Sequence, residues 1–226
     1  LMHVPRLTWD LNLDVAELGR LIEYYGGPGD YHEPAQVRLQ VRPSDKRALP
    51  LTVHGELLTD ALAAELTGEF ESFDGQSGFS ASFALTAEDS HELRQITGVG
   101  LPPMGRLQVT GEVRRATDTH ESITGSVNLE SEKLGQFSAE GILGKQWKIG
   151  SQLELKFKVD RLSKAIAVLP IPLQGNVPLQ AQAIVRTDGE TLQVTELRVT
   201  AGRNDISGEI SYPLNVADSN RQKIDG

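Results

Sequence analysis

Cysteine is absent from this chain of 226 residues, which excludes disulfide bonds and thiol chemistry and gives no indication of a redox compartment. Aromatic residues make up 5% of the chain and hydrophobic residues 38%. These fractions are low for a globular core, but they are expected where every strand keeps one polar face. No apolar run approaches the roughly 20 residues that a membrane-spanning helix needs.

Positive charge is scarce as well. The 22 Lys and Arg are outnumbered by 31 Asp and Glu, so the net charge is −9. Because no basic patch offsets this charge, we expect no nucleic-acid partner. Six basic residues form a loose cluster in the sequence, namely Lys145, Lys148, Lys156, Lys158, Arg161 and Lys164. A solvated strand face explains this cluster better than a binding site does.

Motifs for catalysis, metal binding or phosphate binding are also missing. None of the histidines has a partner at a metal-ligand spacing; they are His3, His32, His54, His91 and His120. There is no nucleophile elbow and no phosphate-binding loop. Glu65, Glu69 and Glu71 lie on one face of an expected strand, as a glycosidase's two carboxylates would, but repeated outward glutamates explain them equally well. We therefore expect a non-enzymatic protein without metal or cofactor.

The residues that are present alternate in a clear pattern between 152 and 213. Leu153, Leu155, Phe157 and Val159 share one face of a predicted strand, and polar residues occupy the other face. Further alternating segments follow at 177–185, 192–199 and 204–213. The Asp-Gly pair at 188–189 predicts a hairpin between two of them. The alternation slips by one residue near Glu196, which predicts a β-bulge.

The same unit occurs three times. Strands at 7–13, 79–85 and 152–159 are followed by Asp14, Thr86 and Asp160, which lie 72 and 74 residues apart. These three residues are of the N-cap type, and we expect each to begin a short helix, at 15–25, at 87–97 and after 160. A Pro/Gly break and three further strands complete each unit. The segment 61–70 has helix-forming residues, but its place in the repeat predicts a strand with Ala64, Leu66, Gly68 and Phe70 facing inward.

The pattern predicts a mainly β fold. We expect a curled antiparallel sheet, of the β-taco or open-groove kind, built from about three repeats of a short helix plus four strands. The repeats span about 7–75, 78–145 and 151–214, and a polar tail occupies 215–226. Residues 1–226 would form a single elongated array that is a segment of a longer protein. About twelve strands, spaced by roughly 4.8 Å, give a sheet nearly 60 Å long. A closed barrel or sandwich with a filled core fits the pattern equally well.

The inward positions are candidates for the functional surface. Phe79, Ala81 and Phe83 line the inner face of the second repeat, and the equivalent positions of the other repeats are also apolar. Phe157, Val185 and Val194 should face inward, whereas Lys156, Gln182 and Gln193 should face water. An uncovered apolar concavity has to bind something apolar or pack against a partner.

Two stretches resemble the AsmA family of Gram-negative envelope proteins. One combines Asp160-Arg-Leu-Ser, the segment 169–183 that begins Leu-Pro-Ile-Pro-Leu-Gln-Gly, and the segment 192–211 that ends Ile-Ser-Gly-Glu-Ile-Ser. The other is Leu101-Pro-Pro-Met-Gly-Arg-Leu-Gln-Val-Thr-Gly-Glu-Val. The resemblance implies a periplasmic segment of a protein anchored in the inner membrane by an amino-terminal helix. It further implies a groove that conducts phospholipid or another acyl lipid towards the outer membrane, support of envelope integrity, envelope protein partners, and no catalytic residues.

Two other functions stay open. The sheet could be a glycan-binding or adhesin module whose site is a loop containing Tyr24, Tyr25, Tyr31 and His32, although packing of this loop onto the sheet is the favoured explanation. It could also be a structural scaffold whose groove is filled by a strand of a partner.

Overall fold

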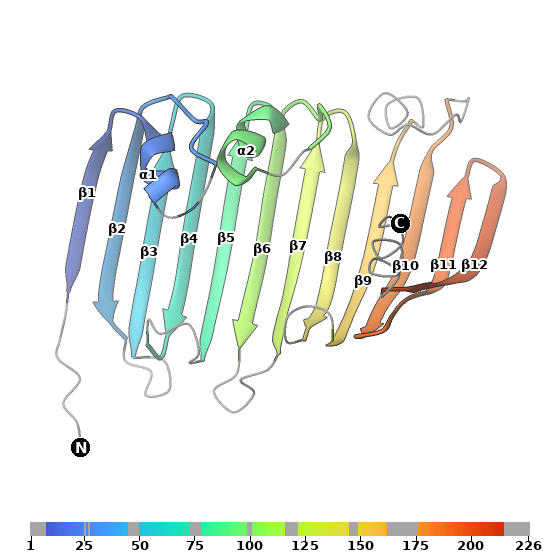
Figure 1. Ribbon diagram of the computed structural model, residues 1–226. Coiled ribbons are helices and arrows are strands. Elements are labelled where there is room, and N and C mark those ends of the chain that lie inside the picture. Colours follow the sequence, from blue (N-terminus) through green and yellow to red (C-terminus); the bar gives the residue numbers. More distant parts are fainter. Residues whose placement is uncertain are drawn as a thin grey trace, which may run out of the picture.

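The computed structural model describes residues 8–24, 26, 28–44, 50–72, 78–98, 101–115, 122–144, 149–161 and 176–214. These residues form one sheet of twelve antiparallel strands, in which the spatial order from β1 to β12 is the order in the sequence (Figure 1). The strands are β1 Trp9–Val15, β2 Ala35–Pro43, β3 Leu51–Leu58, β4 Leu62–Phe70, β5 Phe79–Ala87, β6 Leu107–Arg115, β7 Ile123–Ser131, β8 Gly135–Leu143, β9 Ile149–Val159, β10 Leu179–Asp188, β11 Thr191–Ala201 and β12 Asn204–Pro213. The helices are α1 Leu18–Tyr24, which follows β1, and α2 Ser90–Thr97, which follows β5.

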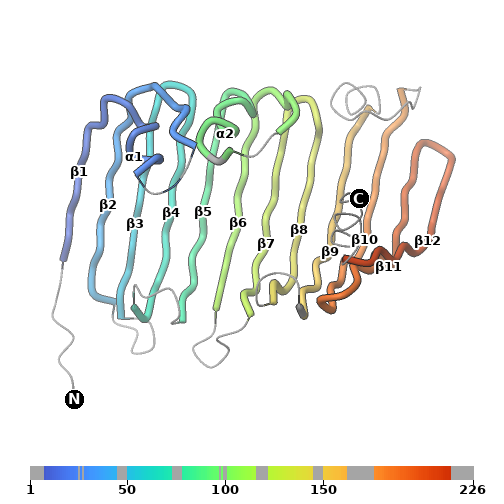
Figure 2. The backbone as a smooth tube through the Cα atoms, viewed as in Figure 1, coloured from blue at the N-terminus to red at the C-terminus, as the bar shows by residue number. Residues whose placement is uncertain are grey.

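The sheet is open. Figure 2 shows the strands side by side from β1 to β12, and these two strands end the order without pairing to each other within the described part of the chain. The described residues therefore form neither the closed barrel nor the second sheet that a filled core would need. It gives a mainly β fold in one open sheet, but it does not bear out the curling of that sheet.

Both helices lie against the same face of the sheet, near one end of the strands (Figures 1 and 2). The contacts of α1 centre on Leu18, Tyr31 and Ala35. Those of α2 centre on a second buried cluster, which consists of Leu62, Ala87, Leu93, Met104 and Leu107. Leu57 and Ile96 pack against both clusters, so the two helices share one small core at this end of the sheet.

The ends of α2 have identifiable caps. The Asp89 side chain accepts a hydrogen bond of 3.0 Å from the backbone N–H of His91, which satisfies one of the donors that the first turn leaves unpaired. At the other end Gly98 has a left-handed φ of 71° and donates to the Arg94 carbonyl. This is the usual role of glycine after a helix.

The prediction that Asp14 and Thr86 are helix N-caps is wrong. Both are the penultimate residues of strands, where Asp14 pairs with Gln36 and Thr86 with Gln108. The ladder continues through these polar residues because their side chains point to the polar face. The helices accordingly begin later than predicted, at Leu18 and Ser90.

The start of α1 needs no side-chain cap, because its first N–H groups bond to the loop that follows the helix. Leu18 N donates to the Glu33 carbonyl at 3.1 Å, and Gly19 N donates to the Tyr31 carbonyl at 2.6 Å. A Cβ on Gly19 would clash with the carbonyl oxygens of Gly29 and Tyr31. This close approach of two backbones explains a glycine inside a helix.

The helix expected after Asp160 falls on 162–175, outside the described residues, as does the turn expected at Asp74 and Gly75. The described part of the chain contains two helices. It therefore does not support a helix in each of three repeats.

Other predictions are confirmed. The described residues form twelve strands, and the segment expected at 61–70 forms β4 (Leu62–Phe70) rather than a helix, because strands pair with it on both sides. The hairpin at Asp188 and Gly189 joins β10 to β11. The register of β11 against β12 shifts between Val194 and Leu197, and Glu196 has a φ of 53°, so the predicted bulge is present.

Candidate functional site

The candidate site is the apolar face of the sheet, which is defined here by the residues that share a face with Phe83. Directly paired residues of neighbouring strands lie on the same face, so the register shows whether the apolar residues of successive strands are neighbours. They form one continuous row that crosses ten strands without a polar side chain. The row consists of Leu11, Leu39, Gly55, Leu66, Phe83, Gly111, Val127, Ala139, Leu155 and Ala183.

The orientations predicted for β9 to β11 are confirmed. Phe157 pairs with Ala181, and Val185 pairs with both Leu153 and Val194, all on the apolar face. Lys156 pairs with Gln182, and Arg186 pairs with Gln193, on the polar face. The three apolar residues are half-buried and the three predicted polar ones are exposed.

Much of the apolar face remains in contact with solvent. The described helices cover only the row of positions at one end of the strands, so Leu66 in the middle of the sheet is 39% exposed. Exposure is greatest in the two edge strands, where Trp9 in β1 is 58% exposed and Ile206 in β12 is 66% exposed. Val41 and Val53 lie on the same face at the end away from the helices, and both are buried. Where a soluble protein leaves a contiguous apolar surface uncovered, the surface commonly marks an interaction site.

Glycine and phenylalanine together shape this face. Phe83 lies opposite Gly111, and its ring occupies the space that a Cβ on residue 111 would need. The Phe70 ring packs over Gly68 in the same way and stacks on Phe79, with ring centroids 5.9 Å apart. The rings therefore lie along the sheet rather than standing on it, which leaves a low and broad apolar surface.

One charged side chain interrupts the apolar face of the described strands. Arg115 ends β6, and its guanidinium carbon lies 5.5 Å from the centroid of the Phe79 ring. This cation–π contact is at the end of the strands opposite the helices (Figure 1). The middle of the face is thus free of charge, and the single cation lies at its border.

The polar face holds a cluster that the sequence analysis missed. His54 Nε2 lies 3.2 Å from Glu56 Oε1, and His54 Nδ1 lies 3.8 Å from Glu65 Oε1. Arg38 Nη1 lies 3.4 Å from Glu56 Oε2. The four residues come from β2, β3 and β4, so only the register of three strands brings them together. In the sequence, their sole signal was that each lies at an outward position.

The glutamates considered for a glycosidase do not form a suitable pair. Glu65 and Glu69 share the polar face of β4 and are four residues apart, which corresponds to about 13 Å along a strand. Glycosidase carboxylates are separated by roughly 5–9.5 Å. Glu71 lies beyond the end of β4.

The described residues of the tyrosine-rich loop do not converge on one surface site. Tyr31 is fully buried, and its hydroxyl lies 2.7 Å from Thr59 Oγ1 and 3.3 Å from Glu33 Oε2. Burial raises the pKa of the Tyr31 phenol, and the neighbouring Glu33 carboxylate adds to the effect. Tyr24 is 82% exposed, His32 is also exposed, and Tyr25 is outside the described residues. Packing of the loop onto the sheet, the favoured explanation, is therefore what Tyr31 does.

Within the described ranges, no three His, Asp or Glu side chains converge as metal ligands. The helices found there are too short and too polar to cross a membrane. Comparison of the chain with family models, with curated proteins and with solved structures found no match.

Proposed function

We propose that the apolar face binds acyl chains of phospholipids or other acyl lipids, as in the AsmA-like envelope proteins that the sequence resembles. The observation that supports this proposal best is the apolar row across ten strands, which lies outside the buried clusters around the helices and in which Leu11 and Leu66 are exposed. An acyl chain gains about 0.8 kcal/mol for each CH₂ that it buries. A surface without charge in its middle matches such a ligand, because no polar group has to lose its water.

The dimensions of the face also favour an acyl chain. A strand of nine residues is about 30 Å long, which exceeds the length of an ordinary acyl chain. Glycine and alanine occupy several central positions, among them Gly111, Gly125, Ala139 and Gly141. The Phe83 ring already occupies the space that a side chain at residue 111 would need, so these small residues keep the surface low rather than open a channel, and an acyl chain would lie across it.

The proposal includes a repeated and curled architecture. The last residues of β1 and β5, the first residues of α1 and α2, and both ends of β2 and β6 are each 72 residues apart. This recurrence supports the first two of the three repeats, at about 7–75 and 78–145. The third repeat, at about 151–214, and a sheet that curls around its ligand complete the proposal. A location in the periplasm, anchoring in the inner membrane and envelope protein partners follow from the resemblance and belong to the same proposal.

Extraction of the purified protein with organic solvent, followed by mass spectrometry, tests the proposal. We expect co-purified phospholipid, and we expect the delipidated protein to take up phospholipid again from vesicles. A parent protein that carries no lipid and takes up none would contradict the proposal. In that case, a partner strand or a second protein surface would have to cover the apolar face.

A further inference from the structure

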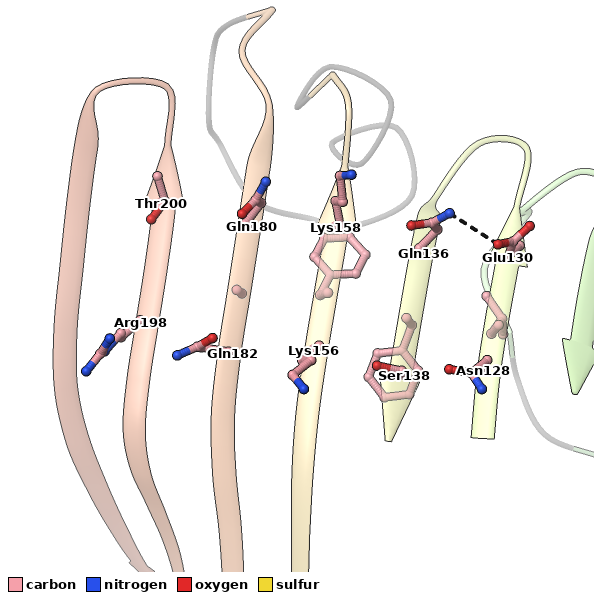
Figure 3. A pocket seen from close by; sticks show the side chains of 14 residues that line it. Asn128, Glu130, Gln136, Ser138, Lys156, Lys158, Gln180, Gln182, Arg198 and Thr200 are labelled. Carbon is pink, nitrogen blue, oxygen red and sulfur yellow. Dashed lines mark hydrogen bonds between the residues drawn. The ribbon is translucent and has the colours of Figure 1, made fainter. Parts of the chain in front are cut away.

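The polar face has a hollow of its own across β7 to β11, with a volume of about 670 Å³. Figure 3 shows its polar side chains in two parallel rows. The first row consists of Glu130, Gln136, Lys158, Gln180 and Thr200, and the second consists of Asn128, Ser138, Lys156, Gln182 and Arg198. Neighbours within each row are directly paired across the strands.

The charge of this hollow is opposite to that of the whole chain. Three cations line it against one carboxylate, although the chain has a net charge of −9. The carboxylate, Glu130, already accepts a hydrogen bond of 3.1 Å from Gln136. Lys156 pairs with Glu154 at 2.8 Å.

The other two cations have no such partner in the part of the chain that the structure describes. Elsewhere on the described strands, Arg38 pairs with Glu56. Lys158 and Arg198, by contrast, make no ion pair or side-chain hydrogen bond among the described residues. The amides of Gln180 and Gln182, which lie between them, are likewise without a hydrogen-bond partner there. The hollow thus presents two available cations and two available amides on adjacent strands.

We propose that this hollow binds an acidic oligosaccharide. Lys158 and Arg198 would form charge-assisted hydrogen bonds with its carboxylate or other anionic groups. Gln180 and Gln182 would bond to its hydroxyl groups, because an amide is both a donor and an acceptor. The hollow lies on the face opposite to the proposed lipid surface, so this inference does not depend on lipid binding.

The spacing of the side chains suits an extended ligand. Lys158 and Arg198 lie on strands that are two apart, roughly 10 Å across the sheet between backbones, so separate anionic groups of one oligosaccharide can contact both. A single-stranded nucleic acid would need aromatic side chains on which its bases stack. The aromatic residues nearest the hollow, Phe137 and Phe157, share the apolar face of the sheet.

The basic cluster noted in the sequence contributes only part of this site. Lys156 and Lys158 line the hollow, whereas Arg161 lies outside it, beyond the end of β9. Lys145, Lys148 and Lys164 are outside the described residues. Arg198 comes from β11 and joins the two lysines only through the pairing of β9, β10 and β11.

Calorimetric titration at low salt tests the proposal, with tetragalacturonate as the acidic probe and maltotetraose as a neutral probe of similar size. We expect the parent protein to bind tetragalacturonate and to bind maltotetraose much more weakly. The double variant Lys158→Gln with Arg198→Gln should lose at least tenfold in affinity for tetragalacturonate. The control is Arg42→Gln with Arg114→Gln, which removes the same charge from the same face outside the hollow. It should bind within twofold of the parent.

Three results would overturn the proposal. The parent could fail to bind tetragalacturonate at millimolar concentration, or the two double variants could lose affinity equally, which would indicate a general charge effect. Phosphatidylglycerol vesicles could instead bind in a manner that requires Lys158 and Arg198 while tetragalacturonate does not, which would assign the hollow to a membrane surface. Thermal melts of both variants check that these exposed substitutions leave the protein folded.

Discussion

Phe83 lies directly opposite Gly111 in the β5–β6 ladder, and a Cβ built on residue 111 would be 2.5 Å from the Phe83 Cζ. The same Cβ would be 2.6 Å from the Ser126 carbonyl oxygen of the neighbouring strand. The ring could turn away, but the backbone oxygen cannot move without disturbing β7. Gly111 is therefore required by its surroundings, and the position of the Phe83 ring on the apolar face depends on it.

We expect Gly111→Val to destabilise the protein by about 1–3 kcal/mol, as overpacking does elsewhere. Gly208→Val is the matched control, because it also replaces an apolar-face glycine and its Cβ would have nothing within 4 Å. Urea denaturation of both variants measures the difference. Equal losses of stability would show that strand propensity, rather than contact with Phe83 and Ser126, determines the effect.

A charge on the apolar face should reduce lipid binding. Val194 pairs with Val185 and Ile210 on this face, and a charge on a lipid-contacting surface costs about 2–4 kcal/mol in membrane barrels. An open sheet is wetter than a bilayer, so we expect the lower part of this range or less for Val194→Asp. Since about 1.4 kcal/mol corresponds to a factor of ten, bound lipid should fall several-fold.

Gln193→Asp is the control for Val194→Asp, because it introduces the same charge one residue away on the polar face. It should leave bound lipid nearly unchanged. Lipid extraction and thermal melts should be run together on both variants. A folded Val194→Asp protein that carries as much lipid as the parent would refute the lipid surface in this part of the sheet.

The cap of α2 should make stability depend on pH. The backbone N–H of His91 stabilises the ionised Asp89 carboxyl and lowers its pKa from the ordinary value of 3.8. A lowered pKa stabilises the fold above the unfolded value, and the contribution is lost as the pH falls through the folded value. We expect Asp89→Ala to cost about 1 kcal/mol near neutral pH.

This loss should shrink at an acidic pH below the ordinary value of 3.8, because the contribution is lost as the pH falls through the lowered pKa of the folded carboxyl. Asp89→Asn keeps an acceptor for the His91 N–H and does not titrate. The difference in unfolding free energy between this variant and the parent therefore measures the contribution of the Asp89 charge. Urea denaturation at both pH values measures the two effects. A cost of Asp89→Ala that does not change with pH would mean that the charge of Asp89 contributes nothing to the cap.

The bulge in β11 should tolerate glycine better than glutamate. Glu196 has a φ of 53°, a left-handed conformation that costs a side-chain-bearing residue roughly 1–2 kcal/mol. Glu196→Gly should therefore be neutral or stabilising by up to about 1 kcal/mol, whereas Glu196→Val should destabilise the protein. Thermal melts distinguish these outcomes. Destabilisation by Glu196→Gly as large as that by Glu196→Val would show that contacts of the side chain outweigh the strain.

Local pattern was sufficient to predict the strands and their two faces. Successive side chains of a strand point to opposite faces, so alternation alone shows which residues share a face. The apolar face of 153–159 and the bulge near Glu196 could therefore be predicted without knowing which strands pair with them. The segment 61–70 shows the limit of local preference, since its alanines favour a helix. The repeat predicted the correct element, and pairing with β3 and β5 is the physical reason for it.

The cap residues show a different limit. Asp14 and Thr86 have the side chains of N-caps, but a residue caps a helix only where the ladder has already ended. The pairing of Asp14 with Gln36 and of Thr86 with Gln108 extends each strand past that point. Local chemistry thus predicted that a helix follows each of these strands, but it could not predict the residue at which the helix begins.

The sequence by itself determined which residues share a face, because that depends only on alternation within a strand. The tertiary structure alone decided which of them meet, because that depends on the register between strands. His54 meets Glu65, and Lys158 and Arg198 line one hollow although they are 40 residues apart in the chain. Whether the sheet closes was also undecided by pattern, since an apolar face has the same alternation in a filled core and in an open sheet.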